Sequence, residues 1–352
     1  MMHQSFPKLG EILWNTYPRL MNADVFPVRK TATNIQKTTR LKNLRNNLRS
    51  LLFLVRTVIF QHKYDLIFIE VNPYSKIGLV ISLLIFFHFL NPKKYVCPFS
   101  LKWNTTTDPK IVKFYEKYIL HKLALVRVSD IATKRYLARK NRPIKSFFIN
   151  GIDLSKFKET PIPKNNLFIL LFASAPMENS INSLSDKGIV LLLNAFKRLV
   201  SIHKNIRLIL IWRGKLYKEI SALISKMKLE KYVEIINKKV DMKHYFRKAH
   251  ATIFTLTNLR GSANYPHSLI ESLACGRPVI VSNILEISTI VENEKCGEVS
   301  DVTVEGVINA VEETIKEYRT LQSNCRKTAE KYFDIRKNIK LLLQELDKSW
   351  KK

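Results

Sequence analysis

Residues 261–283, GSANYPHSLIESLACGRPVIVSN, decide the fold of this chain. A polar loop leads into a short apolar helix, predicted over residues 268–275, and then into a β-branched run at 279–281. A helix that begins beside a buried parallel strand presents backbone N–H groups and the positive end of its dipole. Such a helix start suits a phosphate, and Glu271, one turn into the helix, could reach whatever is attached to it. Taken alone, however, the stretch is more typical of an ordinary α/β crossover with a solvated Glu271.

The rest of the chain alternates apolar strands with helices. Strands are predicted at 65–71, 94–97, 126–129, 147–149, 167–172, 208–212, 233–236 and 251–256. Strands that alternate with helices at this spacing predict parallel, doubly wound sheets. Pro161-Ile162-Pro163 has the composition of a linker, so two domains are expected to meet near residue 160.

The charge of the chain indicates an anionic partner. The net charge is +30 over 352 residues, and residues 1–160 are the more basic part. Such a balance is typical of proteins that contact nucleic acid or an anionic membrane, although a lysine-rich proteome explains part of it. No nucleic-acid motif accompanies the charge. A basic amphipathic helix at 35–60 and an apolar run at 77–90, which is too short to span a bilayer, predict either core packing or contact with a membrane surface.

The cysteines predict neither disulfides nor a metal site. Cys97, Cys275, Cys296 and Cys325 have no paired spacing, which is typical of a reducing compartment. The first twenty residues lack the apolar core of a signal peptide. We expect a cytoplasmic protein without metal or cofactor, held peripherally on the cytosolic face of a membrane.

Three segments resemble family 4 of the retaining nucleotide-sugar glycosyltransferases. Glu271 with SLACGRPVIVS is similar to the donor-site segment of that family, Lys187-Gly188 to its lysine-glycine motif, and FFINGIDLSKF at 147–157 to the end of its first domain. The resemblance implies the GT-B fold, in which two Rossmann-like domains face each other across a cleft and the last helix crosses back to the first domain. The implied parts are a shortened, basic acceptor-side domain at 1–160, a nucleotide-sugar domain at 161–334 and the returning helix at 335–352.

The resemblance also implies the roles of individual residues. Glu271 is expected to hold the nucleotide ribose, while the Lys187 ammonium and the N–H groups of Ser268 and Leu269 bind the diphosphate, whose developing charge such a site must stabilise. The expected donor-binding residues are Lys187, Gly188, Arg213, Ala263, Asn264, His267, Ser268, Leu269 and Glu271.

The chain departs from the family at two positions. Ala263 stands where the family has the first of two glutamates, and Ala173-Ser174 stand where it has Gly-Arg. Arg213, after a neighbouring strand, is a candidate replacement for the missing cation. Glu70, at the end of a first-domain strand, is a candidate for contacting the reacting groups, more as an acceptor-positioning residue than as a base.

The function that follows is sugar transfer, with retention, from a nucleoside diphosphate sugar to a hydroxyl of a glycan or lipid-linked glycan in cell-surface glycan synthesis. Lys187, Glu271 and Glu70 are the expected catalytic residues. Two alternatives stay open at this point. A GT-B sugar-nucleotide epimerase would share the diphosphate site without needing an acceptor, and a non-catalytic binding protein would explain Ala263 and the shortened first domain.

Overall fold

The structure of the protein is a computed structural model. It describes residues 52, 55, 58–59, 61–63, 67–68, 76–99, 109–139, 144–148, 150–164, 166–174, 182–213, 215–259 and 263–350. The chain forms two compact units. The C-terminal unit contains residues 151–335, and the N-terminal unit contains the described residues up to 150 together with those from 336 onward.

The N-terminal unit is built on a four-stranded parallel sheet in the order β1-β2-β3-β4. Its strands are β1 (Ile67–Phe68), β2 (Tyr95–Phe99), β3 (Leu125–Val128) and β4 (Ser146–Phe148). Its helices are η1 (Gln61–Lys63), α3 (Lys76–Phe86), η2 (Pro92–Lys94), α5 (Pro109–Tyr118), η3 (Leu120–Lys122), α6 (Ile131–Ala138) and most of α15 (Ile335–Trp350). The sequence predicts that Asp130 caps a helix through Arg139, and this cap is confirmed, because Thr133 N–H donates to Asp130 Oδ1 at 2.7 Å.

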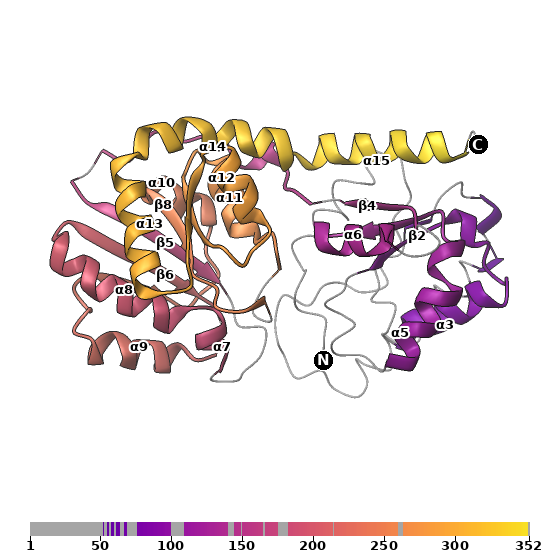
Figure 1. Cartoon of the computed structure of the whole chain (residues 1–352), viewed down its shortest axis with the longest axis horizontal. Coiled ribbons are helices and arrows are strands. Elements are labelled where there is room, and N and C mark those ends of the chain that lie inside the picture. Colours follow the sequence, from indigo (N-terminus) through magenta and orange to yellow (C-terminus); the bar gives the residue numbers. More distant parts are fainter. Residues whose placement is uncertain are drawn as a thin grey trace. The chain divides into compact units, whose positions relative to one another are not determined.

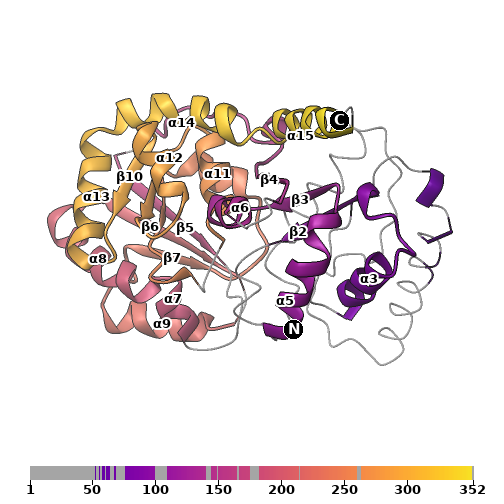
Figure 2. The same cartoon turned by 45° about the vertical axis from the view of Figure 1, so that its right-hand side comes forward.

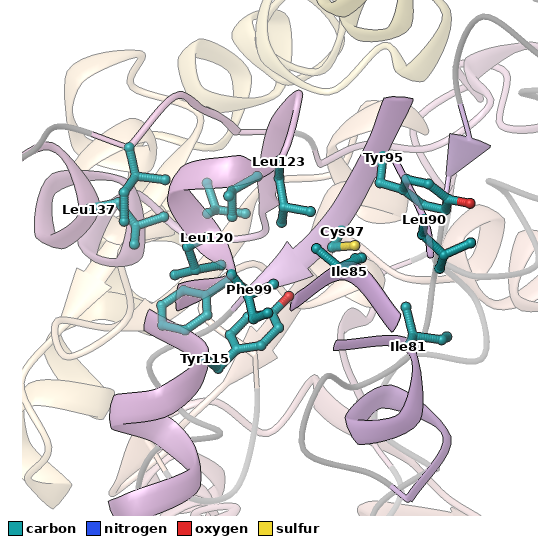
Figure 3. Packing of buried hydrophobic residues seen from close by; sticks show 14 residues of the cluster. Ile81, Ile85, Leu90, Tyr95, Cys97, Phe99, Tyr115, Leu120, Leu123 and Leu137 are labelled. Atoms are coloured by element: carbon teal, nitrogen blue, oxygen red, sulfur yellow. The ribbon is translucent and has the colours of Figure 1, made fainter. Parts of the chain in front are cut away.

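The core of the N-terminal unit lies between α3, β2, β3 and α5 (Figure 3). Ile81 and Ile85 of α3 lie beside β2, and Phe99 of β2 stacks on Tyr115 of α5 with ring centroids 6.4 Å apart. Only one face of α3 enters this core. Its other face is therefore available for a different contact.

The C-terminal unit contains a six-stranded parallel sheet in the order β10-β9-β8-β5-β6-β7. The strands are β5 (Phe168–Ser174), β6 (Ile206–Trp212), β7 (Val233–Ile236), β8 (Ala251–Phe254), β9 (Val279–Ser282) and β10 (Gly297–Ser300). Every residue of β8 and β9 is buried, as expected for central parallel strands that are covered on both faces.

Helices flank both faces of this sheet (Figures 1 and 2). They are η4 (Leu154–Lys156), α7 (Asn182–Asp186), α8 (Ile189–Ile202), α9 (Tyr217–Lys226), α10 (Met242–Lys248), α11 (His267–Ala274), α12 (Ile287–Asn293), α13 (Val304–Lys316) and α14 (Tyr318–Tyr332). Helix α8 packs on α13, and α11 packs on α14.

Two chain segments pair where the C-terminal unit begins and ends. Ile152 N–H donates to Phe333 O at 2.9 Å, and Ile335 N–H donates to Ile152 O at 3.1 Å. Within the N-terminal unit, Asn338 Nδ2 of α15 donates to Asn150 O at 2.6 Å. The compact units thus change between residues 150 and 151, upstream of the predicted linker.

Some predicted elements differ from the structure. Residues 111–125, which the sequence predicts as one helix, instead contain the end of α5 at Tyr118 and the separate turn η3. Helix α14 was missed, because its buried stripe consists mainly of small and polar residues such as Cys325, Thr328 and Ala329. The basic helix predicted at 35–60 lies mostly outside the described residues. Within that range only residues 52, 55, 58 and 59 are described, and all four are helical. Within the described part of the chain, no helix has the length and apolarity of a membrane span.

Candidate functional site

The sheet of the C-terminal unit reverses its strand order at β5. The chain leaves β5 for its neighbour β6 on one side, whereas β8, β9 and β10 follow one another on the other side. In open parallel sheets, ligands bind outside the carboxyl ends of the strands at such a switch point. The segments that follow β5 and β8 are therefore the first place to look for a site, and both contain predicted site residues.

Hydrogen bonds hold these two segments side by side. Thr257, after β8, donates from its N–H to Asp186 O at 3.2 Å and from its hydroxyl to Ser185 O at 2.7 Å. Asn258 Nδ2 donates to the Asp186 carboxylate. Residues about 70 positions apart in the sequence thus form one local structure at the carboxyl edge of the sheet.

The lysine-glycine turn follows directly. Gly188 has φ +71°, and a Cβ at this position would lie only 1.5 Å from Thr255 O, so the position accepts only glycine. Thr255 Oγ1 donates to Gly188 O at 3.0 Å. The preceding Lys187 is 5% exposed, which is rare for lysine. The turn thus fixes a largely buried cationic residue at the switch point, and its binding of a diphosphate stays a prediction.

Helix α11 approaches the same edge with its N-terminus. Its first residue follows Pro266, which cannot cap the helix with a side-chain oxygen. Ser272 Oγ donates to Thr252 Oγ1 at 2.7 Å and so ties the helix to β8. The N–H of Ser268 lies in the first turn, where the helix itself provides no acceptor. The first turn of α11 is therefore suited to an anion.

One of the two predicted amide donors is already used. Leu269 N–H donates to Pro266 O at 3.1 Å, and the Leu269 side chain is fully buried. We therefore correct the prediction that the Leu269 N–H binds the diphosphate, because this N–H forms a hydrogen bond within the first turn of the helix. Ser268 is the remaining donor of the predicted pair.

Two polar side chains are buried around the start of α11. Glu271 is 2% exposed, so the alternative of a solvated helix carboxylate is wrong. Asn264 is buried as well, and its Oδ1 has no hydrogen-bond partner among the described residues. His267 begins the helix, and Ala263 is half-buried just before Asn264. A buried polar atom without a protein partner is costly unless a ligand or water provides one, so this loop is a candidate binding segment.

The remaining predicted residues differ in position. Arg213 is exposed and follows β6, where its N–H donates to Ser174 O at 3.3 Å, so it lies at the same sheet edge. The structure brings this cation beside the end of β5, and its role as a replacement stays a prediction. Glu70 lies outside the described residues.

Sequence reasoning missed the role of Arg277, a fully buried arginine three residues after α11 ends. Its Nε donates to Phe246 O at 2.9 Å, and its Nη1 and Nη2 donate to Thr160 O and Thr160 Oγ1 at 3.2 and 2.7 Å. Nη2 also donates to Pro161 O. Burial lowers the pKa of Arg277, although not enough to neutralise a guanidinium. Its role is structural, because these donors bind the linker.

Two further side chains hold the same segment. Arg326 Nη1 donates to Phe157 O at 2.6 Å and to Ala274 O at 2.9 Å. His250 Nδ1 accepts from Ile169 N–H at 3.1 Å, and its ring is also bonded to the Pro163 backbone. We call residues 157–163, together with Arg277, Arg326 and His250, the linker clamp. The proline pair signalled a linker, but the sequence carries no signal for what holds it.

Other chemistry finds little support in this region. Burial raises the pKa of the Cys275 thiol to about 11, so at neutral pH it is no thiolate nucleophile. Among the described residues, no group of three or more His, Cys, Asp or Glu is placed to hold a metal ion.

Comparison with known families gives one match. The family described as glycosyl transferases group 1 matches residues 180–332, which include the lysine-glycine turn, α11 and the segments between them. A comparison with curated protein sequences gives no match.

Several solved structures are similar to the chain. Sucrose-phosphate synthase from Thermosynechococcus elongatus has a TM-score of 0.66 at 18% identity, covering 91% of this chain and 83% of its own. HepE of Anabaena in complex with UDP has a TM-score of 0.68 at 19% identity, covering 86% and 84%. A glycosyltransferase from Rickettsia africae has a TM-score of 0.67 at 15% identity, covering 91% and 84%. The predicted α/β fold with two Rossmann-like units, the GT-B fold, is confirmed.

Proposed function

We propose that this protein transfers a sugar from a nucleoside diphosphate sugar to a hydroxyl group of a glycan or lipid-linked glycan, with retention of configuration. One observation carries the proposal: the Lys187-Gly188 turn and the first turn of α11 lie at the switch point of one sheet, within residues that match glycosyl transferases group 1. Structures of the similar HepE in complex with UDP and with UDP-glucose support the choice of donor.

The residues divide the work by charge. The Lys187 ammonium and the Ser268 N–H face the diphosphate, whose negative charge grows as the bond to the sugar breaks. Glu271 accepts hydrogen bonds from the ribose hydroxyls, as a buried carboxylate can do strongly. Arg213 provides a second cation for the diphosphate. The Oδ1 of Asn264, which has no protein partner among the described residues, accepts a hydrogen bond from the donor. The N-terminal unit binds the acceptor.

The family-4 assignment is part of the proposal. It rests on Glu271 with SLACGRPVIVS and on Lys187-Gly188, and it treats Ala263 as the degenerate position of the two-glutamate motif. We propose that donor binding survives this loss, because the diphosphate and ribose contacts come from the turn and from α11. The choice of sugar changes instead.

The test begins with a thermal-shift screen across nucleotide sugars, followed by calorimetry with the parent nucleoside diphosphate. Glu271→Ala is expected to weaken nucleotide binding by about 1.5–3 kcal/mol, because a charge-assisted hydrogen bond is lost. Lys187→Ala is expected to lower turnover more than donor affinity, because its charge matters most in the transition state. Unchanged nucleotide affinity in Glu271→Ala would place the donor elsewhere.

Assays without acceptor provide the matched control. A transferase leaves the sugar of the nucleotide donor unconverted apart from slow hydrolysis, whereas conversion into an isomeric nucleotide sugar would identify an epimerase and overturn the proposal. NMR of the anomeric proton in the product of the full reaction reports retention directly.

A further inference from the structure

Helix α3 of the N-terminal unit has an apolar outer face. Its inner residues Ile81 and Ile85 pack beside β2 (Figure 3). Val80, Leu83 and Phe87 lie at the helical spacing of i, i+3 and i+7 and are exposed, Phe87 to 62%. Residues 77–92 contain no Lys, Arg, Asp or Glu at all. A surface helix normally has polar residues on its outer face, so this stripe needs a partner.

The turn after α3 extends the same apolar surface. Phe89 is 60% exposed, and its carbonyl accepts from Gln61 Nε2 at 2.7 Å. Gln61 Oε1 in turn accepts from Asn91 N–H at 2.8 Å. The turn is thus fixed by hydrogen bonds from the 58–63 segment, which also presents Ile59 at 55% exposure. The aromatic tips are held outward by the fold.

Cations border this apolar surface. Lys122 Nζ lies 5.3 Å from the ring centroid of Phe86, and Lys117 Nζ lies 5.0 Å from that of Tyr118. The Phe86 and Tyr118 rings are themselves 5.6 Å apart, so both lysines stand beside the end of α3. Lys93 is exposed in η2. Apolar tips with lysines around them suit the boundary between headgroups and acyl chains of a bilayer.

The sequence around the helix has little negative charge. Between Val25 and Thr107 the only acidic residues are Asp65 and Glu70, against 13 lysines and arginines. The described acidic residue nearest to the face in sequence, Glu116 of α5, accepts from Tyr136 OH at 2.8 Å. A protein partner of ordinary composition would not require such a one-sided charge, whereas an anionic lipid surface attracts it.

We propose that Val80, Leu83, Phe87 and Phe89, with Lys93, Lys117 and Lys122 around them, form a membrane-contact face that inserts shallowly into a bilayer containing anionic lipid. This inference deepens the proposed function and rests on it in one respect, since a lipid-linked acceptor would be presented at such a surface. The face binds lipid headgroups by charge and acyl chains by its apolar tips, so both properties are needed.

The experiment measures cosedimentation of the full chain with vesicles of phosphatidylcholine alone and with vesicles containing about one quarter phosphatidylglycerol. We expect binding to the anionic vesicles, weakened by salt. The double variant Phe87→Ser/Phe89→Ser is expected to lower the partition coefficient at least about tenfold. The matched control Ile202→Ser removes an apolar side chain of similar exposure, 55%, from the C-terminal unit and should change it by less than about twofold.

The lysines are tested in the same assay. Lys93→Gln/Lys117→Gln is expected to lower the partition coefficient about tenfold or more, since each lysine near the surface contributes about 1 kcal/mol. Lys197→Gln/Lys204→Gln, which removes two exposed cations of the C-terminal unit, is the control. Equal loss in both double variants would mean that net charge alone drives binding and would overturn the proposed face.

Two outcomes separate the remaining possibilities. If light scattering shows a dimer that Phe87→Ser/Phe89→Ser converts to a monomer while no form binds vesicles, the face covers a second copy and the proposal is wrong. The nucleotide-sugar screen is repeated on the same variants, whose substitutions belong to the N-terminal unit whereas the described donor residues belong to the C-terminal unit, and they should respond like the parent protein. Vesicle binding with the expected pattern but no nucleotide response supports the face and rejects the proposed function.

Discussion

The two ends of α11 use buried polar groups in opposite ways. Before its first turn, the buried Oδ1 of Asn264 has no partner among the described residues, and Pro266 provides no side-chain cap. Just after its last turn, Arg277 is fully buried, but its donors bind Phe246, Thr160 and Pro161. Polar groups satisfied inside the protein stabilise the fold, whereas groups left open at a helix start are available to a ligand.

The largest effect is expected from Gly188→Ala. The new Cβ would lie 1.5 Å from Thr255 O in a turn with φ +71°, so we expect the free energy of unfolding to fall by about 4 kcal/mol. Gly276→Ala is the matched control at the other end of α11. Its φ is +75°, but the nearest atom to the new Cβ is the flexible Glu159 Cγ at 2.9 Å, so about 1 kcal/mol of backbone strain is expected. Urea unfolding measures both.

If the two glycine variants lost equal stability, the predicted clash with Thr255 O would be contradicted. The cost would then come only from the positive φ that both positions share. The thermal-shift response to nucleotide sugars adds a second criterion. It should disappear in Gly188→Ala and persist in Gly276→Ala, since only the former distorts the turn that carries Lys187.

The second prediction compares two arginines. Arg277→Met leaves buried carbonyls of the linker clamp without donors, and we expect about 3 kcal/mol less stability to urea. Arg213→Met removes an exposed side chain and should change stability by less than about 0.5 kcal/mol. Nucleotide affinity, measured on folded protein, is expected to fall more in Arg213→Met than in Arg277→Met. If Arg277→Met lowered affinity more than Arg213→Met, the clamp would be part of the donor site.

The sequence allowed much of the fold to be predicted. Alternating strands and helices indicated parallel sheets, and the β7 strand predicted at 233–236 has these bounds. Motif residues such as Lys187 and Glu271 follow strand ends, so a parallel sheet brings them to one edge. The strand order itself was beyond prediction from the sequence alone, because it depends on which buried strands pair in three dimensions.

The clamp and the burial of Glu271 were not predictable for a different reason. Arg277 binds mainly backbone carbonyls, such as those of Phe246 and Pro161, and any residue type supplies a carbonyl. Glu271 lies in a short helix whose last six residues are all buried, and periodicity cannot reveal a helix that is covered on every side. Sequence patterns locate such residues without telling whether they serve the ligand or the fold.

The third prediction concerns pH and the clamp. Burial lowers the pKa of His250 from 6.5 to about 4 in the folded protein. The unfolded state therefore binds the proton more readily, so this group's contribution is complete above pH 6.5 and is lost as the pH falls towards 4. Over this pH range we expect the free energy of unfolding to fall by about 2 kcal/mol, a value already reduced for partial solvent screening of the ring. His250→Gln keeps an acceptor and a donor without titrating, so its stability should fall less over this range.

The smallest change in stability is expected at the open end of α11, in Ala263→Glu. Ala263 is half-buried next to Asn264, and the proposed family-4 assignment puts it at the place of the first glutamate, which is expected to contact the transferred sugar. A carboxylate added there meets the sugar rather than the nucleotide, so stability should change by less than about 0.5 kcal/mol and affinity for the parent nucleoside diphosphate by less than about twofold. The order of preference among nucleotide sugars should change instead, because hydrogen bonds to sugar hydroxyls discriminate strongly. Ala263→Gln, of similar size and without charge, shows whether the carboxylate is needed. A loss of nucleotide affinity as large as that expected for Glu271→Ala would mean that residue 263 lies against the diphosphate, and that sugar choice and nucleotide affinity are not separable in this site.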